Sequence, residues 1–237
     1  MSSKISRLSP TDLVNNAALP TTKKWSHLES LETPKVFWGY QPVHAAFPKI
    51  LAVSSGLFGV LRPDTDEAIL SGIRRACHRD EQETANIAVA QAIMEWRDQT
   101  GARAVIANPE PFRSTTGTIK FCADVAVIVG GELFVVNLDV RSTMNLTNGG
   151  KQMMKSLIHH TALLGDLRSA KVAILKTPRV SAGLRKCEIE ELVGSPAYSL
   201  DEVERAVLET YSIWELILMR RRAEAAKKAS GDDGSLL

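Results

Sequence analysis

Two apolar stretches separated by a pair of glycines form the clearest pattern in the chain. The first stretch ends at Val129, the second begins near Leu133, and Gly130 and Gly131 lie between them. Two adjacent glycines readily supply the positive φ angles of a tight hairpin turn, so the pattern predicts paired strands over about 120–129 and 133–140. Both stretches are continuously apolar rather than alternating, which indicates strands that are covered on both faces.

Apolar residues also recur at helical spacing elsewhere, and start and stop signals mark the ends of these segments. Acidic residues after Pro63 suit the positive end of a helix, and Gly101 is a typical C-terminal stop. Ser199 and Glu202 have the spacing of a capping box, which opens a long helix. The segments predicted as helices are 10–18, 63–76, 80–99, 151–164 and the long helix that runs from Ser199 into basic residues.

Shorter apolar runs predict two more strands, at 104–106 and 171–176. The residues over 108–118 hold two prolines, a glycine and several hydroxyl side chains, so we expect a loop there. Residues 188–193 are predicted as a short helix or a turn. The order around the hairpin is therefore helix, strand, strand, strand, helix, strand, which predicts a mixed α/β domain.

Changes in composition along the chain divide it into three predicted parts. Residues 1–62 form an N-terminal arm and an irregular subdomain, because glycines and prolines interrupt the apolar and aromatic residues of 36–61. That aromatic segment is interpreted either as part of this subdomain or as a docking surface. Residues 63–180 form the core domain, and residues 181–237 form a helical extension with a basic tail.

The overall charge and apolar content are those of an ordinary globular protein. The net charge is +2, so a surface that binds nucleic acid would have to come from local clusters. No apolar run is long enough to span a bilayer, and the N-terminus lacks the apolar core of a signal peptide. The three cysteines show no metal-type spacing, which favours buried thiols in a reducing compartment. We therefore expect a cytoplasmic protein without a membrane partner.

The hairpin carries charged residues that its apolar sequence does not explain. Asp124 lies near the start of the first strand, and Asp139 and Arg141 lie at the end of the second. A carboxylate within an apolar strand is unusual, because burying it without a partner is costly. Two acids and a cation at one edge suit a divalent metal beside a phosphate. In the simpler alternative, both acids are structural and Arg141 is only the ion-pair partner of Asp139.

The segment from Asp80 to Lys176 resembles the PD-(D/E)XK nuclease superfamily, which includes restriction endonucleases, resolvases and transposon endonucleases. Asp124 matches the first aspartate of the family's motif, although Ala123 replaces the proline. Asp139 matches the second acid, and Arg141 falls where the family usually has lysine. The resemblance implies a restriction-endonuclease-like αβββαβ core with a mixed central sheet, plus N- and C-terminal helical additions.

The resemblance also implies roles for further residues. Glu83 corresponds to the acid that many members carry on the preceding helix, and Gln152 lies where several branches place a glutamine. The carbonyl of Val140 would be a further metal ligand. The implied catalytic set is Asp124, Asp139, Arg141, Glu83 and Gln152. The implied metal set, for Mg²⁺ or Mn²⁺, is Asp124, Asp139, Val140 and Glu83. The predicted contacts with DNA are Arg113, Ser114, Thr115, Lys151 and Lys155.

The leading hypothesis is therefore a metal-dependent DNA endonuclease that acts in recombination, transposition, restriction or defence. Its partner would be DNA, bound as a homodimer or within a larger nucleoprotein complex. Arg141 limits this hypothesis, because arginine stays protonated and cannot accept a proton from the attacking water. The alternative is a catalytically inactive protein of nuclease fold that binds nucleic acid or scaffolds a partner complex. A third hypothesis is an unrelated α/β ligand-binding protein with incidental acids.

Overall fold

A five-stranded mixed sheet forms the centre of the molecule. The computed structural model describes residues 8–31, 39–51, 64–107, 112–113, 120–121, 124–141 and 146–231. The strand order is β1-β4-β5-β6-β9, and only the β5–β6 pair is parallel. The strands are β1 (Arg103–Ala107), β4 (Val125–Val129), β5 (Glu132–Asp139), β6 (Lys171–Lys176) and β9 (Glu188–Glu191). Residues 188–191 therefore form an edge strand, so the short helix or turn predicted there is wrong.

The predicted hairpin is β4 and β5. Gly130 and Gly131 have φ angles of 58° and 84°, which is the backbone conformation that the turn requires. The first predicted strand is divided, because Lys120–Phe121 forms β3 and β4 begins only at Val125. β3 pairs with β2 (Phe112–Arg113) in a separate two-stranded sheet, and β2 lies in the stretch over 108–118 that was predicted as a loop.

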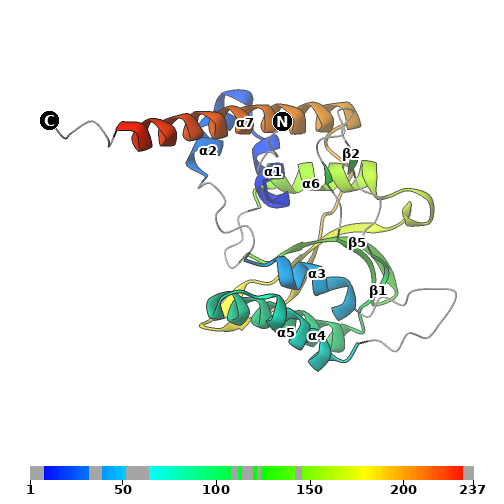
Figure 1. Cartoon of the computed structure of the whole chain (residues 1–237). Helices are drawn as coiled ribbons and strands as arrows, with labels where there is room; N and C mark the ends of the chain where they lie inside the picture. The colour runs from blue at the N-terminus through cyan, green and yellow to red at the C-terminus, as the bar shows by residue number, and fades with distance from the viewer. Residues whose placement is uncertain are drawn as a thin grey trace.

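Two layers of helices cover the two faces of the sheet (Figure 1). One layer contains α1 (Pro10–Ala17), α2 (Thr21–Ser30), α6 (Asn148–Thr161) and α7 (Leu200–Gly231). The other layer contains α3 (Gln41–Ile50), α4 (Asp66–Ala76) and α5 (Asp80–Thr100). The remaining elements are a 3₁₀ turn, η1 (Gly165–Leu167), and a hairpin of β7 (Arg179–Ser181) and β8 (Leu184–Arg185).

The central strands are buried on both sides, as their continuous apolar sequence predicts. Val135 of β5 packs with the α1/α6/α7 layer, whereas its neighbour Val136 packs with the α3/α4/α5 layer. This alternation follows from the period of two along a strand. The prediction of a mixed α/β fold with a mixed central sheet and flanking helices is confirmed. Within the part of the chain that the structure describes, no helix is both long and apolar enough to span a bilayer.

Side-chain caps fix where several helices begin. The Oγ of Ser9 accepts a hydrogen bond from the N–H of Asp12 at 2.9 Å, and Thr65 caps α4 in the same way. At the start of α7 the backbone N–H of Ser199 donates to the Glu202 carboxylate at 2.8 Å, which confirms the capping box. Gly101 ends α5 in the left-handed conformation, with φ 66°.

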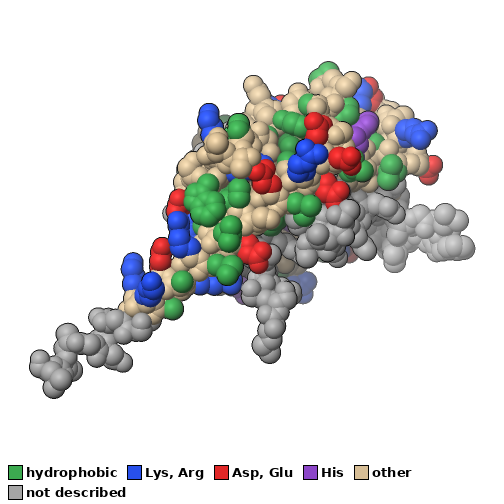
Figure 2. All heavy atoms as spheres, turned by 90° about the horizontal axis from the view of Figure 1, so that it is seen from above, with side chains coloured by type: hydrophobic (Ala, Val, Ile, Leu, Met, Phe, Trp, Pro, Cys, Tyr) green, Lys and Arg blue, Asp and Glu red, His purple; other side chains and the backbone are tan. Residues whose placement is uncertain are grey.

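The long helix α7 carries the basic residues of the C-terminal extension. Its C-terminal part extends past the other elements in Figure 1, and Figure 2 shows Lys and Arg side chains along that part. Arg220 pairs with Glu29, and Arg221 donates to the carbonyl of Leu31 at 2.9 Å. These arginines therefore hold the C-terminal end of α2 against α7.

The first helix packs tightly against the start of α6. The Oδ1 of Asn15 accepts hydrogen bonds from the backbone N–H and the hydroxyl of Thr147, at 3.0 and 3.1 Å. Thr147 in turn accepts a hydrogen bond from the N–H of Gly150 at 2.9 Å. A Cβ at position 150 would overlap the Asn15 side chain, so only glycine allows this approach.

Gly150→Ala is expected to destabilise the protein by about 1–3 kcal/mol, because the added methyl group forces Asn15 away from Thr147. The measurement is the free energy of unfolding in urea. Gly72→Ala in α4 is the matched control, since a Cβ there meets no atom within 4 Å. The control should gain up to about 1 kcal/mol from the better helix propensity of alanine. Equal stability of the two variants would contradict the tight α1–α6 contact.

Candidate functional site

Asp124 lies directly before β4, and its side chain makes contacts within the protein. Its Oδ2 accepts a hydrogen bond from the N–H of Leu138 at 2.6 Å. Its Oδ1 lies 3.8 Å from the Nδ1 of His44 on α3. The carboxylate therefore satisfies a backbone donor of β5 on the side of the α3/α4/α5 layer.

Asp139 ends β5 and is only 9 % exposed. Its Oδ1 accepts hydrogen bonds from the Nε and the backbone N–H of Arg141, at 3.1 and 3.2 Å. The Nη1 of Arg141 also lies 3.4 Å from Asp12 of α1. The simpler alternative, in which Arg141 is the ion-pair partner of Asp139, is thus the arrangement observed. His44, beside Asp124, lies on α3, whereas Asp12, which contacts Arg141, lies on α1 in the opposite helical layer.

The carbonyl of Val140 binds a cation that belongs to the protein. It accepts a hydrogen bond from the Nη1 of Arg185 at 2.7 Å, and the same nitrogen donates to the carbonyl of Thr177 at 2.8 Å. The Nη2 of Arg185 donates to the hydroxyl of Tyr40 at 2.5 Å. Arg185 therefore joins the ends of β5 and β6 through the carbonyl that the resemblance assigned to a metal ion.

Sequence reasoning missed Arg185. The residue lies in a two-residue strand, and Val140 and Tyr40 are far from it along the chain. No spacing rule links these positions, so the sequence carries no signal for the cluster.

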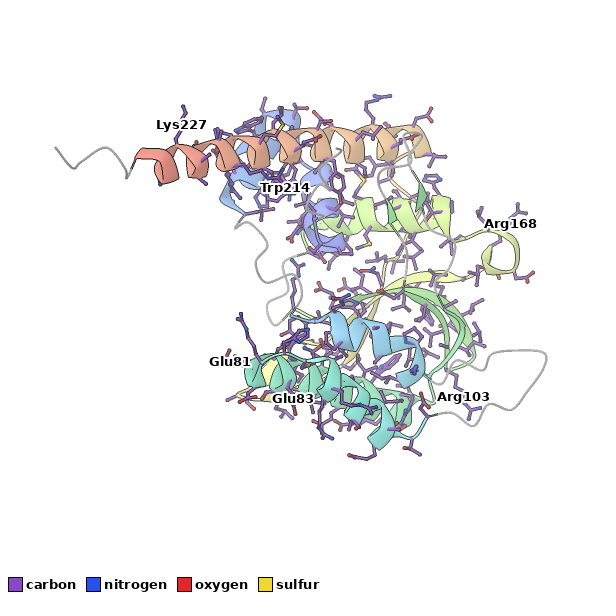
Figure 3. All side chains as sticks on the ribbon, in the orientation of Figure 1. Glu81, Glu83, Arg103, Arg168, Trp214 and Lys227 are labelled. Carbon is purple, nitrogen blue, oxygen red and sulfur yellow. The ribbon has the colours of Figure 1, made fainter. Side chains whose placement is uncertain are left out.

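The two helical residues of the implied site lie in different layers. Glu83 is on α5, where its carboxylate is half exposed and lies 3.8 Å from the Nε of Arg74. Figure 3 shows Glu83 on α5, in the layer opposite α6. Gln152 is exposed on α6. Among the described residues, no group of three His, Cys, Asp or Glu side chains could hold a metal ion. Binding of Mg²⁺ or Mn²⁺ stays a prediction.

The two lysines predicted to contact DNA face β9 and the residues after it. The Nζ of Lys151 donates to Glu190 at 2.5 Å, and Glu190 also pairs with Lys176. Lys155 is 7 % exposed, and its Nζ donates to the carbonyl of Leu192 at 2.6 Å. Burial lowers the pKa of the Lys155 and Lys176 side chains.

The remaining predicted contacts with DNA cannot be placed. Ser114 and Thr115 lie outside the described residues. Only the backbone of Arg113, in β2, is described.

These observations define the class of protein: a mixed α/β protein in which the charged side chains at the strand ends bind other groups of the same chain. Comparison with known families then identifies the chain. Residues 11–224 match the model of the sliding clamp-binding bacterial toxin SocB family, and the chain belongs to this family. It is similar to the DNA replication inhibitor toxin SocB of Caulobacter vibrioides (strain NA1000 / CB15N), with 26% identity over 237 residues and 95% of each chain covered. No solved structure matches the chain.

The family assignment corrects three predictions. The chain does not belong to the PD-(D/E)XK superfamily, and a nuclease, a hydrolase or a magnesium-dependent endonuclease is the wrong functional class. DNA is the wrong partner, because the family description names a protein, the sliding clamp. The alternative hypothesis, a catalytically inactive protein that scaffolds a partner complex, was closer to the family description than the nuclease hypothesis was. The error arose because acids and cations at the ends of paired strands can also serve as hydrogen-bond and ion-pair partners within the protein.

Arg185→Ala is expected to destabilise the protein by about 3 kcal/mol, because it leaves the buried carbonyls of Val140 and Thr177 without their donor. Arg179→Ala on the same hairpin is the matched control. Arg179 is exposed, and its loss should change stability by no more than about 0.5 kcal/mol. Unfolding in urea measures both variants. A loss at Arg185 as small as that at Arg179 would show that the guanidinium does not hold the strand ends.

Proposed function

We propose that this chain binds the sliding clamp of its bacterial host and thereby inhibits DNA replication. The observation that carries the proposal is the family match over residues 11–224, supported by the relative whose printed name is DNA replication inhibitor toxin. Such a protein would act in the cytoplasm, where the clamp works.

The segment over 36–61, interpreted as a subdomain or a docking surface, can now be divided. Phe47, Ile50 and Leu51 are fully buried against α4 and α5, so they belong to the core. Residues 32–38 and 52–63 lie outside the described residues. Because Phe47, Ile50 and Leu51 are buried, the docking hypothesis keeps the other large apolar pairs of the segment, Phe37-Trp38 and Leu57-Phe58.

We infer that Leu57-Phe58 is the main contact with the clamp. It lies in the run AVSSGLFGVL over 52–61, which holds five large apolar residues among small ones. Phenylalanine and other aromatic side chains are enriched in protein interfaces, and a few such anchors usually carry most of the binding energy. Phe37-Trp38 is the second candidate, with aromatic residues but a shorter apolar sequence.

The restriction-endonuclease-like topology is proposed only as a description of the sheet. The strands β2 and β3 form a separate small sheet. With these two left aside, α5, β1, β4, β5, α6 and β6 follow the αβββαβ order, and the parallel β5–β6 pair suits a helical crossover through α6. No nuclease activity is attached to this description.

The test is binding of the purified chain to the purified clamp on a biosensor, together with DNA synthesis in cells that express the chain. The double variant Leu57→Ala/Phe58→Ala should bind at least about tenfold more weakly, since an anchoring aromatic contributes about 2 kcal/mol. It should also restore DNA synthesis. Val180→Ser/Leu184→Ser is the matched control, because these apolar residues are exposed on the β7–β8 hairpin.

The outcomes separate the two parts of the proposal. If the unmodified chain does not bind the clamp, the proposed function is wrong. If it binds and only Phe37→Ala/Trp38→Ala weakens binding, clamp binding stands and the assignment of Leu57-Phe58 is wrong.

A further inference from the structure

A pocket of about 430 Å³ lies between the first turns of α5, the β7–β8 hairpin and Tyr40. This volume is within the range of ligand-binding pockets. Ala85 and Ala88 face it from α5, and Gly183 faces it from the hairpin. Because these residues are small, the space is left open rather than filled by side chains.

The inner wall of the pocket carries a buried positive charge. Arg185 is 9 % exposed, and its guanidinium lies 5.4 Å from the centre of the Tyr40 ring. A guanidinium has five N–H donors, and three of those of Arg185 bind neutral oxygens of Val140, Thr177 and Tyr40. Two donors remain, and no described carboxylate forms an ion pair with the group. Buried charges in proteins are usually paired, so a buried cation without a described carboxylate partner is suited to binding an anion.

The mouth of the pocket carries the opposite charge. Asp80 and Glu81, in the first turn of α5, are exposed and line the pocket, and Figure 3 marks Glu81 there. Neither carboxylate has an ion-pair partner among the residues that the structure describes. Arg179 also lines the mouth, so the net charge of the mouth is −1 while the inner wall is positive.

This separation of charge selects for a ligand with two charged ends. A simple anion would be attracted to Arg185 but repelled at the mouth. A simple cation would be attracted at the mouth but repelled by Arg185. We propose that the pocket binds a small zwitterion of the ω-amino-acid class, in which an apolar chain separates the two charges, with its carboxylate at Arg185 and its ammonium group at Asp80 and Glu81. Tyr40, Ala85 and Ala88 contact the apolar chain between the two ends. Neither Leu57 nor Phe58 is among the described residues that line this pocket.

The test uses four probes that share a six-carbon chain and differ in their end charges: ε-aminocaproate, caproate, hexylamine and adipate. Binding to the isotope-labelled full chain is followed by NMR through the amide signals of Ala85, Ala88 and Gly183. ε-Aminocaproate should shift these signals in a saturable way, with a dissociation constant on the order of 1–10 mM at low salt. The three probes that lack one of the two charges, or carry the wrong one, should bind at least about tenfold more weakly.

Two variants test the site without disturbing Arg185, whose loss is expected to destabilise the protein. Ala88→Leu places a larger side chain in the pocket and keeps good helix propensity, so it should abolish the shifts. Gln91→Leu, at an exposed position of α5 outside the pocket, is the matched control and should leave them unchanged. Glu81→Gln should weaken binding of ε-aminocaproate several-fold while leaving that of caproate no weaker.

The proposal is overturned if ε-aminocaproate causes no saturable shift at these amides. Equal binding of caproate and ε-aminocaproate would also overturn it, because the acidic mouth would then have no role. If Ala88→Leu fails to fold, the Glu81→Gln comparison still decides, since Glu81 is exposed and contributes no buried contact.

Discussion

The structure depends on the burial of β5 and β6 on both faces of the sheet. Val135, Val136 and Ala173 are at most 1 % exposed, and helices cover them on either side. Charged groups at the ends of such strands cannot remain fully hydrated, and an unpaired buried charge is costly. The side chains at these ends must therefore be satisfied within the protein. This requirement explains the arrangement of Asp139 and Arg185, which are each 9 % exposed.

Two kinds of partner meet this requirement: an oppositely charged side chain, or neutral oxygens. Asp139 pairs with Arg141, and Lys176 pairs with Glu190 of the neighbouring edge strand. Arg185 instead binds the carbonyls of Val140 and Thr177, so its charge has neutral partners only. In the first two cases a neighbouring side chain of the protein neutralises the charge at the strand end. The third leaves a cation facing a pocket, and the proposed zwitterion site follows from that difference.

Local signals predicted the elements well, because each depends on neighbours in the chain. The Gly130-Gly131 turn, the capping box at Ser199 and the stop at Gly101 were all predicted and are observed. The edge strand over 188–191 was missed. Its residues Glu188, Glu190 and Glu191 are charged, and they enter the sheet through pairing with β6 and contacts with lysines. A charged edge strand has no apolar alternation that a sequence pattern could detect.

The candidate site shows where sequence reasoning stops. The sequence by itself determined that Asp124, Asp139 and Arg141 lie at the ends of two adjacent strands, because the hairpin and its register depend on local residues. Only the tertiary structure decided what these groups contact: His44 of α3 beside Asp124, Asp12 of α1 beside Arg141, and Arg185 on the Val140 carbonyl. Such partners are distant in the chain and are brought together by the packing of two helical layers on one sheet. A pattern of residues defines which charges are present, but the fold decides whether they face a ligand or one another.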